Sequence, residues 1–337
     1  MNYSGCTVKE FHILAASFMA ITEFGGEGGN VYGTIRVGWL PGVPYAPFVR
    51  GGRVPQPRLS SNADVFHSYG TRKGPRITNC TFEFAADDFF NVHNEMQVAF
   101  QMDTEHNSST VFLIDPHEPV DQVGKAVGFR IPRTVYGTIA SLDYARPGDT
   151  LSFATSDVGC PKRPHPCQFA AVGTAAIVGI TRVDGGADPA VLARAAATFG
   201  RICGGKVSCG HSVSSHVYRV LLDGPVAVPA AGCLANVDEM SAAGAVVEGS
   251  VFRHNNANLG RWKSPRSVIR GNTFENAAFC NLEVVPLQQY LEGPWDIPAV
   301  RIVNNSFPDC SAGHTITHGA LAQVTATGNR YGDGMPD

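Results

Sequence analysis

The stretch Val268-Ile269-Arg270-Gly271-Asn272-Thr273-Phe274 decides the fold, because its pattern returns along the chain. In every copy, Ile or Val is followed five residues later by Phe. The copies are Ile77–Phe82, Val247–Phe252, Ile269–Phe274 and Ile302–Phe307. Phe252 and Phe274 are 22 residues apart, and repeats of this length are typical of stacked supersecondary units. The pattern predicts the coils of a right-handed parallel β-helix, with the Phe side chains stacked inside.

The composition favours a β protein and excludes several classes of partner. Of 337 residues, 37 are Gly and 22 are Pro, and only 16% are charged. Such a composition favours strands and turns over helices. The formal net charge is −3 and there is no basic block, which argues against nucleic acid as a partner. No apolar run reaches the roughly 18 residues of a membrane span.

The coil pattern is interrupted in the middle of the chain. It covers residues 1–100 and returns over 246–330, and 331–337 reads as a tail. The segment 101–245 between the two parts has a different pattern of short strands and turns. We therefore expect a β-rich inserted domain there.

Three segments indicate what the inserted domain is. Arg146–Phe153 is a turn leading into an alternating strand, and Ala175–Val183 and Val217–Leu222 read as further strands. Short strands bounded by turn residues are typical of antiparallel barrels and sandwiches. Pro189–Phe199 is the one good helix candidate. The predicted fold class is all-β, a right-handed parallel β-helix interrupted by a small antiparallel β-barrel or sandwich-like insertion.

The nine cysteines bear on whether the protein is exported, because disulfides form in oxidising compartments. Cys160 with Cys167, and Cys203 with Cys209, are close pairs in loop-like surroundings, which favours disulfides over a zinc site. By contrast, Cys80, Cys280 and Cys310 lie in or beside coil copies and are expected to be small buried apolar residues.

The first residues show no signal-peptide pattern. The apolar segments between residues 7 and 21 read as parts of a core, with no clear cap before them. The sequence is therefore consistent with a fragment of an exported or extracellular protein.

Three acidic residues form the candidate chemical centre. Asp64 and Asp87 are 23 residues apart, about one coil, and neighbouring strands lie about 4.8 Å apart. Such an offset would gather Asp64, Asp87 and Asp88 on one outer surface. Alternation along Phe90–Val92 predicts that Phe89, Asn91 and His93 point outward. The simpler interpretation is a turn in which Asp side chains cap backbone amides.

Glycoside hydrolysis uses two carboxyl groups with different pKa values, one as proton donor and one as base or nucleophile. Carboxyl groups about 6.5–9.5 Å apart leave room for a water molecule and invert the anomeric centre. We expect parallel coils to supply such a spacing, because side chains on neighbouring strands diverge outward.

The phrases around these acids resemble the β-helical alpha-1,3-galactosidase family of glycoside hydrolases. The similarity lies in Asn62-Ala63-Asp64 with His67, and in Asp87-Asp88-Phe89-Phe90-Asn91-Val92-His93 about one coil later. It continues through Arg146–Phe153, Arg261–Phe274 and Tyr290–Gly293. A similar group of three Asp residues occurs in pectin-degrading polygalacturonases. The resemblance implies a β-helical, galactosidase-like glycosidase, and the expected activity is that of an inverting exo-acting enzyme.

The hypothesis assigns catalysis to four carboxylates. Asp64, Asp87 and Asp88 form the acid and base cluster, and Glu292 approaches from a loop after a later coil. His67, Asn91, His93, Arg261 and Trp295 are the expected substrate-binding residues, and Tyr290 is a further candidate for stacking on a sugar. Lys263 and Arg261 also fit a solvated position, and Trp295 also fits a packing role.

Two other functions remain open at this point. A non-catalytic β-helix would bind glycans at a cell surface. A polysaccharide lyase would need a cation or a basic residue to neutralise a uronate. The glycosidase needs no cofactor or metal, whereas Ca²⁺ on the Asp cluster fits the lyase or binding alternatives. In each case the expected partner is an oligo- or polysaccharide, and the oligomeric state is left open.

Overall fold

The computed structural model describes most of the chain. The described residues are 4–14, 16, 19–38, 59–102, 108–115, 141–156, 168–183, 188–202, 216–287 and 291–335. The chain divides into two compact units. Unit 1 comprises Met1–His93, Ala242–Val285 and Ile297–Asp337, and unit 2 comprises Asn94–Ser241 and Pro286–Asp296.

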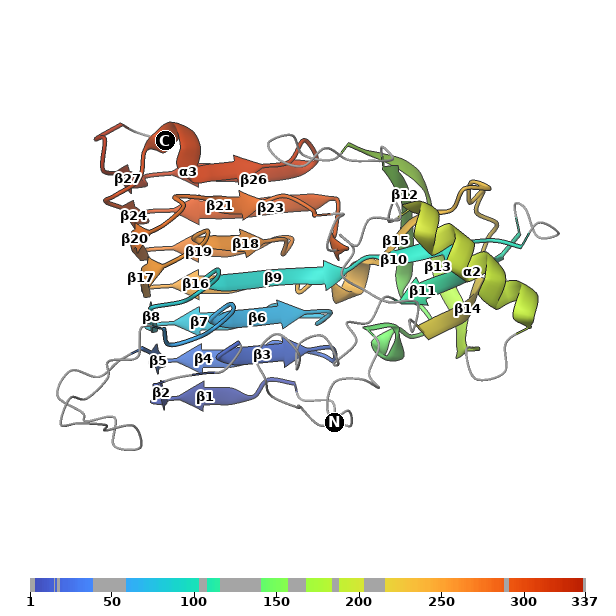
Figure 1. The fold of residues 1–337 in the computed structure, drawn as a ribbon, viewed down its shortest axis with the longest axis horizontal. Coiled ribbons are helices and arrows are strands. Elements are labelled where there is room, and N and C mark those ends of the chain that lie inside the picture. The colour runs from blue at the N-terminus through green and yellow to red at the C-terminus, as the bar shows by residue number, and fades with distance from the viewer. Residues whose placement is uncertain are drawn as a thin grey trace, which may run out of the picture. The chain divides into compact units, whose positions relative to one another are not determined.

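Unit 1 is a parallel β-helix made of three stacked sheets, as the repeat predicted (Figure 1). The first sheet has the order β1 (Thr7–Lys9), β4 (Val31–Gly33), β7 (Arg76–Thr78), β16 (Val246–Glu248), β19 (Val268–Arg270), β23 (Ile297–Val303) and β26 (Ala322–Thr327). The second has the order β2 (His12–Ile13), β5 (Arg36–Val37), β8 (Thr81–Glu83), β17 (Val251–Asn255), β20 (Thr273–Ala277), β24 (Ser306–Phe307) and β27 (Arg330–Tyr331). The third has the order β25 (Ile316–His318), β21 (Leu282–Val284), β18 (Gly260–Trp262), β9 (Phe90–Glu95), β6 (Phe66–Tyr69) and β3 (Ile21–Phe24).

The Phe residues of the repeat form a column inside the helix. The rings of Phe252 and Phe274 stack at 4.8 Å, and Phe274 stacks on Phe307 at 5.1 Å. Tyr331 continues the column at 5.3 Å from Phe307. The expected inward stacking is therefore confirmed. Because Tyr331 is a buried member of this column, the tail begins after it.

A second interior column is made of asparagines at the turn between the first two sheets. The Asn305 side-chain carbonyl accepts hydrogen bonds from the backbone N–H and the side-chain amide of Asn272, each 3.0 Å long. Asn329 makes the same two contacts to Asn305. The preceding residues, Gly271 and Asn304, have the positive φ angles. The ladder pairs the buried backbone groups where the chain turns.

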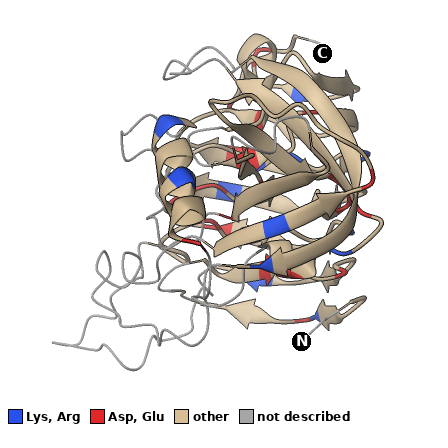
Figure 2. Cartoon of the chain, turned by 90° about the vertical axis from the view of Figure 1, so that its right-hand side faces the viewer, with Lys and Arg blue, Asp and Glu red and all other residues tan. Residues whose placement is uncertain are grey.

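Unit 2 contains a closed antiparallel barrel of six strands, which confirms the predicted insertion. Its order is β10 (Gln97–Phe100), β11 (Thr110–Asp115), β14 (His216–Leu222), β13 (Phe169–Arg182), β12 (Thr150–Ser156) and β15 (Cys233–Val237). The helix α2 (Pro189–Ile202) is present and contributes Val191, Ala195 and Phe199 to a core with Val98 and Leu234. In Figure 2 most of the coloured ribbon of the chain is tan, in keeping with the small fraction of charged residues in the sequence.

The remaining elements are short. They are the 3₁₀ helices η3 (Ser141–Tyr144) and η5 (Asp238–Met240), the strand β22 (Glu292–Gly293) and the helix α3 (Ala312–Thr315). The strand β22 pairs antiparallel with the end of β9. Among the described residues, no helix is long and apolar enough to cross a membrane.

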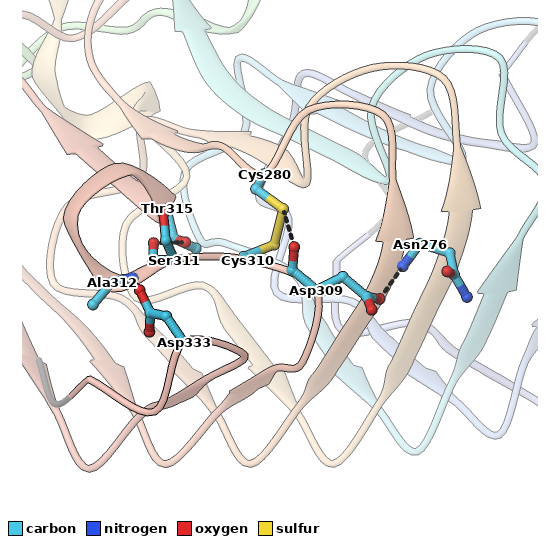
Figure 3. Close-up of a disulfide and its surroundings, with 8 residues drawn as sticks. All are labelled: Asn276, Cys280, Asp309, Cys310, Ser311, Ala312, Thr315 and Asp333. Atoms are coloured by element: carbon cyan, nitrogen blue, oxygen red, sulfur yellow. Dashed lines mark hydrogen bonds between the residues drawn. A yellow bond between two sulfur atoms is a disulfide. The ribbon is translucent and has the colours of Figure 1, made fainter.

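Two predictions about cysteines meet different outcomes. Cys80 is buried, as expected. Cys310 is buried as well, but Cys280 is only partly buried, and the two are not separate apolar residues: they form a disulfide across 30 residues that joins neighbouring coils (Figure 3). Each turn brings the next coil back alongside the previous one, so distant cysteines become neighbours. The pairs Cys160/Cys167 and Cys203/Cys209 lie outside the described residues.

Two other expectations are corrected. Phe89 does not point outward but is completely buried in the core with Phe90. It precedes β9, so strand alternation does not extend back to it. The strand Thr7–Lys9 is exposed rather than part of a core, because only one side of the strand has a neighbouring coil, through β4.

Candidate functional site

The third sheet of unit 1 carries the candidate site, where the chain bends before β6 and before β9. Asp64 precedes β6, and Asp87 and Asp88 precede β9. One carboxylate oxygen from each of the three residues lies within 4.8 Å of the others. The structure therefore brings together the three acids that the sequence singled out, although their roles remain a proposal.

The register differs by one residue from the sequence estimate. Phe66 pairs with Phe90, and the Val65 backbone N–H donates to the Asp88 carbonyl. Asp64 is thus aligned with Asp88, 24 residues later, and not with Asp87. The bend over 86–89 leaves Asp87 beside this pair, and Asp87 is the most exposed of the three.

Asp88 is completely buried beside a cation. Its Oδ1 accepts a hydrogen bond from the Asn258 backbone N–H at 2.9 Å, and its Oδ2 lies 3.1 Å from Arg261 Nε. Burial away from water raises the pKa of Asp88 to about 7, Arg261 partly opposes this rise, and the charges of Asp64 and Asp87 add to it. A carboxyl group in this cluster therefore holds a proton close to neutral pH.

Asp64 begins a chain of hydrogen bonds through two histidines. His67 Nδ1–H donates to Asp64 Oδ2 at 2.6 Å. In a neutral His67 the other ring nitrogen accepts, and His93 Nε2 lies 3.0 Å from it. The His93 ring also stacks on Tyr69, with 5.6 Å between centroids. These contacts fix both imidazoles against the acid cluster and give Asp64 a partner that can exchange protons.

A row of polar side chains continues from the acids across the sheet, and Asn91 and Glu283 within it are buried. His67, Asn91, Arg261 and Glu283 are aligned in successive strands. Arg261 Nε is 3.4 Å from Glu283 Oε2 as well as close to Asp88. Three of the five expected substrate-binding residues, His67, Asn91 and His93, thus lie on the two strands that follow the acids, and Arg261 lies on the neighbouring strand β18.

Lys263 was expected to fit a solvated position, and this is wrong. Its side chain is completely buried, and its Nζ donates to Asn91 Oδ1 at 3.3 Å. Arg261 is likewise mostly covered, with 18% of its side chain exposed. Of these two cations, Arg261 lies against Asp88, where its charge partly offsets the repulsion within the cluster.

The other two predicted site residues belong to unit 2. Glu292 lies in β22, opposite Glu95 of β9, and is buried. Trp295 is 7% exposed and packs with Phe169, with 6.2 Å between ring centroids. The contacts of Trp295 are those of a core residue, which is the packing role that the sequence also allowed. Tyr290 lies outside the described residues.

Glu283 is a site residue that was not predicted from the sequence, and Lys263 was not among the predicted site residues. Glu283 follows Arg261 by 22 residues, which is one coil. The same spacing that revealed the Phe column could have identified it as the neighbour of Arg261. The burial of Lys263 has no comparable signal, because it depends on what surrounds the strand in three dimensions.

The geometry of the cluster permits two kinds of chemistry. Two carboxylate oxygens within 4.8 Å can accept hydrogen bonds from one water molecule between them, since such bonds are about 2.7–2.8 Å long. The same three oxygens could hold a hard cation such as Ca²⁺. The spacing inside the cluster is shorter than the about 6.5–9.5 Å between the carboxyl groups of inverting enzymes, so spacing alone does not select an inverting course.

Comparisons with known proteins do not assign the chain to a family. No family model and no curated protein matches the chain. Among solved structures, the chain is similar to the Gp54 tailspike of Acinetobacter baumannii bacteriophage AP22, solved in complex with A. baumannii capsular saccharide, at 9% identity. The match covers 80% of this chain but 41% of the tailspike chain, with a TM-score of 0.19. A TM-score this low supports no argument about function.

Proposed function

We propose that the protein is a glycoside hydrolase whose acid and base groups are Asp64, Asp87 and Asp88. The observation that carries the proposal is the grouping of three carboxylates from two adjacent coils, one of them with a pKa of about 7. Hydrolysis near neutral pH needs one carboxyl group that retains a proton and another that has lost it. A cluster that shares one proton among three carboxylates meets both needs.

The roles follow from exposure and hydrogen bonding. Asp87 is the most exposed acid, so it contacts the sugar and delivers the proton to the leaving oxygen. Buried Asp88 stores that proton, and its backbone N–H donates to Asp87 Oδ1 at 3.0 Å. Asp64, held by His67, accepts a proton from the attacking water. Because these groups interact strongly, the protonation near pH 7 belongs to the cluster as a whole.

The finer assignment rests on the sequence resemblance. We propose a galactosidase-like, exo-acting enzyme with direct attack of water and inversion of the anomeric centre. His67, Asn91, His93 and Arg261 bind sugar hydroxyl groups along the row of polar side chains. Glu292 and Trp295 remain predicted contributors whose roles need separate variants.

The test is hydrolysis of a panel of aryl α- and β-glycosides, starting with galactosides, with and without EDTA. We expect turnover that EDTA does not change, and a first-formed sugar of inverted configuration by proton NMR. Asp87→Asn and Asp64→Asn should each reduce kcat by about 10²–10⁴-fold. Asp188→Asn, which keeps the polar side chain at the start of α2, is the matched control. Full activity in both site variants would refute the assignment.

A second function, polysaccharide lyase, is favoured by one specific observation. Arg261 lies beside Asp88 with 18% of its side chain exposed, and a lyase needs a cation to neutralise a uronate and a base to take its proton. Products with a new double bond absorb in the ultraviolet. Such absorbance from a polyuronate, lost in EDTA, would replace the hydrolase proposal. If neither reaction occurs on glycans that the protein binds, a binding function is the remaining explanation.

A further inference from the structure

The first sheet of unit 1 carries a shallow groove that the proposed reaction does not use. Its volume is about 550 Å³, and it crosses successive coils on the outer face of β16, β19, β23 and β26. The residues that line it include Glu248, Val268, Arg270, Arg301, Asn304 and Thr327. The acid cluster belongs to a different sheet of the same unit.

The groove has more positive than negative charge. Arg270 Nη2 lies 2.8 Å from Glu248 Oε1, and Arg76 Nη2 lies 3.5 Å from Glu248 Oε2. The Glu248 carboxylate is therefore paired with two guanidinium groups, those of Arg270 and Arg76. Arg301 is exposed between Val268 and Thr325 in register, and within the described residues its side chain has no acidic partner.

The rest of the groove is lined by glycines, which leave the backbone accessible, and by uncharged polar side chains. Gly249 and Gly271 line it with positive φ angles of 60° and 62°, and a Cβ placed on Gly271 would meet no atom within 4 Å. Asn304 and Thr327 add an amide and a hydroxyl group. A ligand with both hydroxyl and anionic groups would find partners for each.

We propose that this groove binds an acidic saccharide, a short oligomer of hexuronic acids. The Arg301 guanidinium pairs with a sugar carboxylate through its two parallel N–H groups, a geometry that suits arginine. Arg270 attracts a second carboxylate, and Asn304 and Thr327 bind hydroxyl groups. The groove has only two arginines, on the neighbouring strands β19 and β23, and this small positive charge matches the carboxylates of such a chain better than the dense phosphates of nucleic acid. This site does not depend on hydrolysis at the acid cluster.

The test is a calorimetric titration of the full-length chain carrying Asp87→Asn, which prevents turnover, with trigalacturonate at low salt. We expect Arg301→Gln to weaken binding about tenfold, equal to about 1.4 kcal/mol. Arg330→Gln removes an equally exposed arginine outside the groove and should leave the affinity unchanged. The methyl-esterified trisaccharide, which lacks the charges, should also bind about tenfold more weakly.

Three results would overturn the proposal. The first is an unchanged affinity in Arg301→Gln, which would place the ligand elsewhere. The second is equal binding of the methyl ester. The third is inorganic sulfate binding as tightly as the trisaccharide with the same dependence on Arg301, which would indicate a simple anion site. In otherwise native protein, Arg301→Gln should hydrolyse small aryl glycosides at the native rate, so failure of this proposal and failure of the hydrolase proposal are distinguishable.

Discussion

Asp88 is the residue on which the chemistry of the cluster depends. It is completely buried, it contacts Arg261, and it lies beside two other carboxylates. Burial raises its pKa more than Arg261 lowers it, and the result is a pKa of about 7. A proton is therefore held at neutral pH by a group that would have lost it in water.

The first prediction concerns the pH dependence of catalysis. If the shared proton is delivered to the leaving group, kcat/KM should fall tenfold per pH unit above an apparent pKa near 7. In Asp88→Asn the remaining acids interact with Arg261 without this buried partner, so the alkaline limb should move to lower pH. A pH–rate profile from pH 4 to 9 checks both expectations. An unchanged alkaline limb in the variant would contradict the role of Asp88.

The second prediction concerns stability. Because the pKa of Asp88 rises from 3.8 to about 7 on folding, the folded chain binds this proton more tightly than the unfolded chain. Stability from this group is complete below about pH 4 and is lost as the pH rises through 7. Asp88→Asn should therefore gain about 1–3 kcal/mol of unfolding free energy at pH 8 relative to the native chain, and much less at pH 4. Urea unfolding at the two pH values measures this difference, and a loss of stability at pH 8 would contradict it.

At the scale of elements, the asparagine ladder holds the turn between the first two sheets. Asn305 donates to the Ile269 carbonyl and accepts from Asn272. Both partners are buried, so they cannot turn to water when the side chain is removed. The ladder joins neighbouring coils much as the Phe column does, but through hydrogen bonds.

The third prediction is that Asn305→Ala lowers the free energy of unfolding by roughly 2–4 kcal/mol, because it leaves several buried polar groups unpaired. Thr325→Ala, at an exposed position of the neighbouring strand β26, should change it by less than about 0.5 kcal/mol. Chemical denaturation of both variants gives the comparison. Equal effects would show that the ladder does not stabilise the turn.

The fourth prediction concerns the disulfide between coils. Cys280 and Cys310 close a loop of 30 residues, and a crosslink of this length restricts the unfolded chain. The double variant Cys280→Ser/Cys310→Ser should lose about 2–4 kcal/mol. Denaturation with and without a reducing agent is the measurement. Reduction should destabilise the native chain more than the double variant, and an equal effect on both would mean that the Cys280–Cys310 bond is absent in solution.

At the scale of the whole molecule, the sequence predicts the repeating features best. The spacing of Phe252 and Phe274 revealed the coils, because identical side chains stack in a solenoid. The acids were also identified, but the aligned pair is Asp64 with Asp88, because this coil is 24 residues long: Ser61 already pairs with Ala85, as Phe66 does with Phe90. Alternation failed at Phe89 because this residue lies in the bend before β9 and not in the strand. Such local bends follow from packing and leave no period in the sequence.

Other parts of the molecule could not be read from one sequence. The pairing of Cys280 with Cys310, and the burial of Lys263, arise only when distant segments fold together. The strand β7 pairs with β16 across an intervening segment of about 170 residues, which contains most of unit 2. The coil pattern continues across that gap, so both parts of the β-helix were predicted, although nothing local marks the contact.

The fifth prediction tests the central claim, that this fold places a proton-donating carboxylate where it can cleave a glycosidic bond. Asp87→Asn should be compared with the native chain on two glycosides of the same sugar. One has a dinitrophenyl leaving group, which departs without a proton, and the other has an unactivated alcohol. The account predicts a loss of kcat/KM of about 10²–10⁴-fold on the unactivated glycoside and a much smaller loss on the dinitrophenyl glycoside. Equal losses on both substrates, or none on either, would contradict it.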